Sequence, residues 1–212
     1  MRTIVITGAS DGIGAAASRQ LVARGHRVVL VGRSPKKTRA VAAELGTPYH
    51  LADFSDLAQV RRLAGELLEA YSRIDVLANN AGGVFGKRQL TGDGFEQTFQ
   101  VNHLGPFLLT NLLRERLVES EASVIQTASA AARLFSRFDV TDLNAARRYS
   151  GWRAYGNAKL ANILFTRELQ RRWGSDGVSA VAFHPGVVAT NFAGNTGGAL
   201  RWMHHSPSRA AC

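Results

Sequence analysis

The stretch Thr7-Gly-Ala-Ser-Asp-Gly-Ile-Gly14 stands between a β-branched apolar run at residues 3–7 and a segment with helical apolar spacing at residues 14–24. Glycine allows a tight turn, close approach of backbone to a ligand and direct packing of a helix on a strand. The first N–H groups of a helix are unpaired and bind phosphate. Strand, glycine-rich turn and helix in this order therefore predict a site for a dinucleotide pyrophosphate, although three glycines can also form a tight turn alone.

The alternation of strand-like and helix-like segments continues along the chain. Strands are predicted at residues 3–7, 27–31, 48–52, 74–79, 123–127 and 178–183. Helices are predicted at residues 14–24, 35–45, 56–71, 95–118 and 152–173. Residues 82–94 and 130–151 are expected to be loop-like insertions near the carboxyl ends of the strands. This order predicts the α/β class: a doubly wound Rossmann-type parallel sheet of about six strands, with helices on both faces and ligands bound at the strand carboxyl ends.

Composition limits the class of protein further. With 212 residues, 45% hydrophobic and 20% charged, the chain is expected to form one domain over residues 1–212. The only cysteine is Cys212, so no intrachain disulfide can form, and a reducing, cytoplasmic location is expected. Residues 1–6 do not resemble a leader peptide, and no apolar stretch is long enough to span a membrane. The net charge is +10, but the arginines are scattered along predicted helices, so nucleic acid is not an expected partner.

The end of the second predicted strand bears on the choice of dinucleotide. A carboxylate about 20 residues beyond the glycine turn would hold a ribose 2′-hydroxyl. This chain instead has Gly32 and Arg33, with Lys36 and Lys37 nearby. Because the Arg33 guanidinium can grip a 2′-phosphate with two hydrogen bonds, NADP is favoured over NAD as the cofactor. Two points stand against this: Arg33 could be a solvated strand-end residue, and Asp11 would repel a phosphate if it pointed inward.

Tyr155 and Lys159 lie four residues apart in a predicted helix, so their side chains share one face. Tyrosine ionises near ~10 in water, and a fixed cation beside it would stabilise the phenolate. The pair is therefore predicted to move a proton near neutral pH. The alternative is an amphipathic helix face with a solvated lysine.

Taken in order, these motifs resemble the classical short-chain dehydrogenase/reductase family over residues 3–191. The glycine turn matches the family's Thr-Gly-x-x-x-Gly-x-Gly, and Asn79-Asn80-Ala81-Gly82 matches the segment that follows its fourth strand. The resemblance implies that the cofactor is bound by Gly8, Ser10, Gly12, Ile13, Gly14, Arg33, Asp53, Asn80, Ala81, Gly82, Tyr155, Lys159, Pro185, Gly186, Val188 and Thr190. Outside this family, Asp53 would be a helix N-terminal cap and Thr190 a plain loop residue.

The same resemblance implies four catalytic residues: Asn102, Ser129, Tyr155 and Lys159. Tyr155 would donate a proton to a carbonyl, Ser129 would orient that carbonyl, and Lys159 would lower the Tyr155 pKa and bind the nicotinamide ribose. Asn102 would hold a water that relays protons. The alternatives are a backbone-bonding amide for Asn102 and a strand-end cap for Ser129. His184 is expected to be structural, and no Cys/His cluster suggests a metal site.

Residues 138–169 are similar to the retinol-dehydrogenase-like and protochlorophyllide-reductase-like branch, which implies an apolar alcohol, aldehyde or ketone as substrate. Family members commonly form dimers or tetramers, so a homo-oligomer is expected. Ala158 replaces the serine that usually precedes the lysine. Only residues 192–212 follow the Pro-Gly segment, so the family's seventh strand is expected to be missing and residues 178–183 to form an exposed edge strand. The chain would then bind substrate weakly, and the alternative function is a catalytically impaired dinucleotide-binding sensor or interaction protein.

Overall fold

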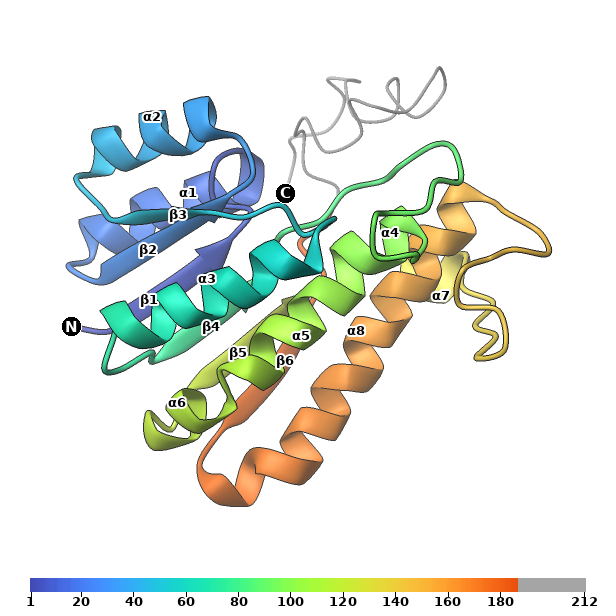
Figure 1. Ribbon diagram of the computed structural model, residues 1–212. Helices are drawn as coiled ribbons and strands as arrows, with labels where there is room; N and C mark the ends of the chain where they lie inside the picture. The colour runs from blue at the N-terminus through green and yellow to red at the C-terminus, as the bar shows by residue number, and fades with distance from the viewer. Residues whose placement is uncertain (187–212) are drawn as a thin grey trace, which may run out of the picture.

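The computed structural model describes residues 1–186, and they form a six-stranded sheet flanked by helices (Figure 1). All strand pairs are parallel, in the order β3-β2-β1-β4-β5-β6. In chain order the strands are β1 (Thr3–Thr7), β2 (Arg27–Gly32), β3 (Tyr49–Leu51), β4 (Val76–Asn79), β5 (Ser123–Thr127) and β6 (Ser179–Phe183). The predicted doubly wound α/β class is therefore confirmed, with strand ends shifted by one or two residues.

Helices cover both faces of the sheet because side chains alternate along each strand. Ile4 and Ile6 of β1 face α1 and α2, whereas Val5 faces α3, α5 and α8. Figure 1 shows α3, α5 and α8 lying across one face. The helices are α1 (Gly12–Ala23), α2 (Pro35–Leu45), α3 (Leu57–Ala70), α4 (Gln97–Phe99), the π-helical turn η1 (Gln100–Leu104), α5 (Gly105–Leu112), α6 (Arg114–Glu119), α7 (Ala131–Leu134), α8 (Gly151–Trp173) and the short 3-10 turn η2 (Gly174–Asp176).

The prediction of one continuous helix over residues 95–118 is wrong. The segment is divided into α4, the π turn η1, α5 and α6. Pro106 is the cause of the first break, because a proline has no N–H and its ring clashes with the carbonyl four residues earlier, here that of Asn102. The chain widens instead, and the Gly105 N–H bonds the Gln100 carbonyl five residues back. A carbonyl at Asn102 is thereby left without its usual helical partner.

The second insertion, residues 130–151, was expected to be a loop, but it begins with the short helix α7. Ala131 and Ala132 are buried, and the segment lies close against Gly156 of α8. A Cβ at Gly156 would come within 2.8 Å of the Ala131 carbonyl oxygen. The small residue on α8 therefore lets the insertion pack tightly on the helix that carries Tyr155 and Lys159.

Strand β6 forms one edge of the described sheet, as expected for residues 178–183. Val181 is 52% exposed and Phe183 41% exposed, whereas Val178 is buried. The expectation of a missing seventh strand concerns residues outside those that the structure describes. No helix in residues 1–186 is both long and apolar enough to cross a membrane.

Candidate active site and cofactor cradle

The turn from β1 to α1 needs glycine at three positions. Gly8 and Gly12 have φ values of +67° and +52°, in the left-handed region that favours glycine. A Cβ at Gly14 would lie 2.3 Å from the Gly8 carbonyl oxygen, and one at Gly8 would lie 2.8 Å from the Ala81 Cα. The turn is thus packed against the segment after β4, and the N-terminus of α1 opens at the carboxyl edge of the sheet. Ser10 and Ile13, both half-buried, complete it.

Thr7 and Asn80 tie the glycine turn to neighbouring strands. The Thr7 Oγ1 accepts hydrogen bonds from the backbone N–H groups of Asn80 and Ala81, both at 3.0 Å. In return, Asn80 Nδ2 donates to the Thr7 carbonyl at 3.1 Å, and its Oδ1 accepts from the Thr127 hydroxyl at 3.3 Å. The ends of β1, β4 and β5 are therefore held in one polar unit. Thr7 begins the glycine motif but was not predicted to be a site residue.

Asn102 and Lys159 meet at Gly82. A Cβ on Gly82 would lie 2.5 Å from the Asn102 Oδ1 and 3.4 Å from the Lys159 Nζ, so only glycine fits between them. The Asn102 side chain is held on both ends: Nδ2 donates to the carbonyls of Thr98 and Gly83 at 2.8 Å, and Oδ1 accepts from the Gly83 N–H at 3.2 Å. Asn102 therefore has the contacts of an amide that bonds the backbone, and it lies beside Lys159.

Two residues of the sequence-predicted set, Tyr155 and Lys159, are buried on α8. The Lys159 Nζ donates to the Thr127 carbonyl at 2.8 Å and lies 5.4 Å from the centre of the Tyr155 ring. Burial lowers the Lys159 pKa to about 8, because the ammonium has lost its water. The alternative of a solvated lysine is excluded, since only 2% of Lys159 is exposed.

The Ser129 side chain interacts with the Tyr155 phenol, so these two side chains are brought together. Burial raises the pKa of Tyr155 to about 12, and the interaction with Ser129 opposes that rise. The net shift is opposite to the lowering expected from Lys159, because burial is its largest cause, and in the chain by itself the phenol stays protonated over the whole neutral range. Ser129 also accepts a hydrogen bond from the Ala131 N–H at 3.2 Å, which begins α7.

On the other side of β1, Arg33 follows β2 and is exposed. Gly32 lies directly against Ser10 and Thr38, with no room for a Cβ. Asp11 forms an ion pair with Lys37 at 2.7 Å. The carboxylate that could have repelled a phosphate is therefore turned toward a lysine on α2.

Asp53 follows β3 but is not the N-terminal cap of the next helix. That cap is Asp56, whose carboxylate accepts from the N–H groups of Ala58 and Gln59. The Asp53 Oδ1 instead accepts from the backbone N–H and the hydroxyl of Ser55, at 2.9 and 2.7 Å. Asp53 thus lies at the carboxyl edge of the sheet with its carboxylate half-buried.

The Pro-Gly segment enters the same edge directly after β6. Pro185 is half-buried, and Gly186 has a φ of +80°. His184 is exposed. Val188 and Thr190, the last two of the predicted cofactor-binding residues, lie outside the described residues.

Two further side chains, Asn162 and His103, support the site and were not predicted. The Asn162 Nδ2 donates to the Asn102 carbonyl at 3.0 Å, the carbonyl that Pro106 excludes from helical bonding. Because that amide end donates, Asn162 Oδ1 must accept, so the His103 Nδ1 carries the hydrogen in their 2.9 Å bond. Burial lowers the His103 pKa, which keeps the ring neutral. The sequence could have indicated Asn162, because this residue follows Lys159 by nearly one turn of the same helix.

A parallel sheet with a glycine-rich first turn, and with a half-buried serine beside a buried tyrosine, lysine and asparagine at its carboxyl edge, defines a dinucleotide-dependent oxidoreductase class. A family model described as short chain dehydrogenase matches residues 2–199, and the chain belongs to this family. Members of the family use a nicotinamide cofactor, and the resemblance stated from the motifs is confirmed.

Among individual relatives, a provisionally assigned daunorubicin C-13 ketoreductase from Streptomyces sp. (strain C5) is 48% identical over 202 residues, covering 92% of this chain and 69% of the relative. Retinol dehydrogenase 12 from Mus musculus is 41% identical, covering 92% of this chain and 64% of the relative. This chain thus spans roughly two thirds of the length of these proteins. The retinol-dehydrogenase-like resemblance is confirmed.

Solved structures show the same fold. An uncharacterised protein from Mycobacterium paratuberculosis is 39% identical with a TM-score of 0.80, covering 100% of this chain and 78% of that chain. An alcohol dehydrogenase from the archaeon Thermococcus sibiricus, complexed with 5-hydroxy-NADP, is 29% identical with a TM-score of 0.73. It covers 93% of this chain and 81% of that chain.

Proposed function

We propose that this chain is an NADP-dependent oxidoreductase that transfers a hydride between the nicotinamide and an apolar carbonyl or alcohol, with Tyr155 as proton donor and acceptor. The observation that carries the proposal is the contact between three side chains. The Tyr155 phenol interacts with the Ser129 side chain, and the Lys159 ammonium lies against the same ring. A buried proton donor, a second hydroxyl and a cation in contact are what carbonyl reduction needs from a protein.

The residues of the cradle fit a dinucleotide. Gly8 and Gly14 let the turn pack closely on its neighbours, and Gly12 has a left-handed φ, so backbone N–H groups lie at the N-terminus of a 12-residue helix where a pyrophosphate can bind. For the adenosine end we propose that Arg33 holds the 2′-phosphate and that Asp53 contacts the adenine. Two related structures, the Thermococcus alcohol dehydrogenase and Pseudomonas aeruginosa RhlG, carry NADP-type ligands by their descriptions, which favours NADP here too.

When bound, the cofactor supplies or accepts the hydride. For reduction, Ser129 positions the carbonyl oxygen, and Tyr155 gives that oxygen its proton. The raised Tyr155 pKa keeps the phenol protonated and ready to donate at neutral pH. The Lys159 cation stabilises the phenolate that remains. Because the Lys159 pKa is about 8, we expect the rate of reduction to fall above about pH 8 as this cation loses its proton.

Substitution of Tyr155 tests the proton transfer. In Tyr155→Phe the ring packing is kept and the proton is lost, so reduction of a panel of aldehydes and ketones should slow by about 10²- to 10⁴-fold. NADPH binding, followed by its fluorescence, should stay within about twofold. The control is Tyr49→Phe, which removes an exposed hydroxyl bonded to Arg39. Turnover by Tyr155→Phe equal to that of the unaltered chain would show that Tyr155 has no such role.

Cofactor choice is tested at Arg33. Because a guanidinium binds a 2′-phosphate through two charge-assisted hydrogen bonds, Arg33→Ala should weaken NADPH binding by about 10- to 100-fold and leave NADH nearly unchanged. Arg61→Ala, an exposed arginine on α3, removes the same charge elsewhere. Equal weakening for both cofactors would contradict the NADP assignment. Tight binding of NADPH without turnover of any carbonyl or alcohol would instead favour a dinucleotide-binding sensor.

A further inference from the structure

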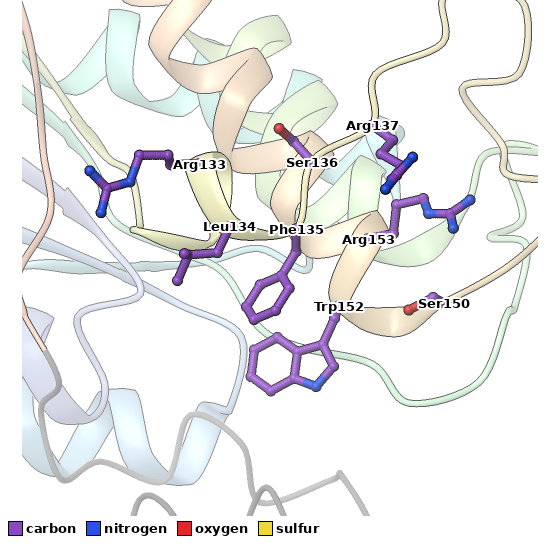
Figure 2. A pocket seen from close by; sticks show the side chains of 8 residues that line it. All are labelled: Arg133, Leu134, Phe135, Ser136, Arg137, Ser150, Trp152 and Arg153. Atoms are coloured by element: carbon purple, nitrogen blue, oxygen red, sulfur yellow. The ribbon is translucent and has the colours of Figure 1, made fainter.

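A surface pocket lies between α7 and the start of α8, outside the residues assigned so far. Its volume is about 470 Å³, and it is lined by residues 133–137, Ser150, Trp152 and Arg153 (Figure 2). The lining combines two aromatic rings with three arginines, and no described lining residue carries a carboxylate. Such a composition suits a ligand that is both flat and negatively charged.

The rings of Phe135 and Trp152 form one wall. Their centres are 5.1 Å apart and their planes are inclined by 33°. Phe135 is 41% exposed, and Figure 2 shows its ring and the Trp152 ring directed the same way. Two neighbouring aromatic faces left partly open to solvent offer a stacking surface for another flat ring.

The arginines supply the charge. Figure 2 shows Arg133 on one side of the two rings and Arg137 and Arg153 together on the other. Within residues 1–186 these three guanidinium groups take no part in any ion pair, whereas Arg147 of the same insertion is paired with Asp139. Two cations beside one pocket without a counter-charge repel each other, and an anion placed between them relieves that repulsion.

The pocket adjoins the proposed proton donor. Trp152 precedes Tyr155 by three residues on α8, so both side chains lie on neighbouring turns of one face. Ala131 at the start of α7 packs against Tyr155 and Val84. Ser129, which interacts with the phenol, begins the same segment that carries Phe135. A molecule with its carbonyl at Tyr155 can therefore extend its far end toward the pocket.

We infer that the pocket binds the body of the substrate, and that this body is a planar conjugated ring system bearing a carboxylate. The ring stacks on Phe135 and Trp152, and the carboxylate lies between Arg137 and Arg153. This inference rests on the function proposed above for Tyr155, since it places the reacting carbonyl at the other end of the same molecule. It replaces the broad class of apolar carbonyl compounds with flat aromatic compounds that also carry a carboxylate.

Equilibrium binding tests the pocket without turnover. Calorimetry would compare 2-naphthoate with 2-naphthamide, its uncharged counterpart of similar shape, in the presence of NADP. At low ionic strength we expect 2-naphthoate to bind about tenfold more tightly, as two exposed charge pairs allow. The double variant Arg137→Gln/Arg153→Gln should lose that preference. Arg61→Gln/Arg167→Gln, which removes two exposed arginines elsewhere, should keep it. Equal affinity for both ligands, or a preference that survives in the first variant, would overturn the inference.

Turnover separates this inference from the proposed function. The substrates are 6-formyl-2-naphthoate and its primary amide, with NADPH oxidation followed by absorbance. We expect the acid to have about a tenfold lower KM with a similar kcat, and Arg137→Gln/Arg153→Gln to raise only the KM of the acid. Equal KM values with good turnover would leave the proposed function intact and overturn the pocket. Arginine-dependent naphthoate binding without turnover of either aldehyde would support the pocket and contradict the proposed function.

Discussion

Lys159 is a charged residue whose side chain is almost completely removed from water. Its side chain is buried, its Nζ has the Thr127 carbonyl as partner, and its pKa has fallen to about 8. In the unfolded chain the same group titrates near ~10.4. Burial of the cation therefore destabilises the folded protein at neutral pH, which is a cost that functional residues commonly carry.

The pH dependence of stability should reveal this cost. Between about pH 8 and ~10.4 the unfolded chain holds more of the Lys159 proton than the folded chain, so the free energy of unfolding contributed by Lys159 rises with pH. Relative to Lys159→Met, wild type should gain roughly 2 kcal/mol between pH 7 and pH 9.5. Urea unfolding at both pH values measures the difference. Tyr155 is present in both proteins, and its raised pKa affects the free energy of unfolding only above pH ~10. Its contribution therefore cancels in the comparison. Parallel pH profiles would show that Lys159 is not perturbed.

For individual residues, the sequence predicts the chemical role of a side chain better than it predicts the surroundings of that side chain. Tyr155, Lys159 and the glycines of the first turn follow from short spacings, because helical and turn geometry fix such neighbours. The contact of Asn102 with Gly82, and the bonds of Thr7 to Asn80, join residues far apart in the chain. The direction of the Tyr155 pKa shift also depends on burial by such distant groups, which the spacing of Tyr155 and Lys159 alone could not predict.

Among the elements, the π turn η1 links the break in a helix to the candidate site. Pro106 removes the Asn102 carbonyl from the helical ladder, and Asn162 on α8 gives it a new partner at 3.0 Å. The Asn162 amide also fixes the His103 ring, which is packed among Phe99, Phe107 and Phe165. One side chain on α8 thus holds the turn that presents Asn102 to Lys159.

Removal of the Asn162 amide should loosen this turn. Asn162→Leu leaves the buried Asn102 carbonyl and His103 Nδ1 without partners, which should reduce the free energy of unfolding by about 2 to 4 kcal/mol. Asn157→Leu is the matched control on the same helix. Its amide bonds the backbone of the exposed residue Arg137, so the loss should be about 1 kcal/mol or less. Chemical denaturation gives both values. Similar losses in the two variants would contradict a special role for Asn162.

Element type was predictable where apolar periodicity is long, as in α3 and α8. The break at η1 was not predicted, although Pro106 within the segment was a usable signal. Helix α7 was missed because it is only four residues long and is stabilised by packing against Gly156 rather than by its own sequence.

At the scale of the whole molecule, the two helical layers do not cover the sheet equally. Helices α1 and α2 lie over β1 to β3, and on that same face Ile125 of β5 and Val181 of β6 are only partly buried or exposed. The two side chains are register partners in adjacent strands. The described sheet therefore ends in an apolar edge, a feature that promotes association between chains.

A charge at this edge should reduce association without changing the fold. Val181 is 52% exposed, so Val181→Lys places its ammonium in water and should alter the free energy of unfolding by no more than about 0.5 kcal/mol. A lysine on an edge strand disfavours pairing with a second sheet, so light scattering at high protein concentration should develop more slowly. Ala58→Lys, at an exposed position of α3, adds the same charge away from the edge and controls for net charge. If both variants reduced scattering equally, net charge rather than the β6 edge would govern association.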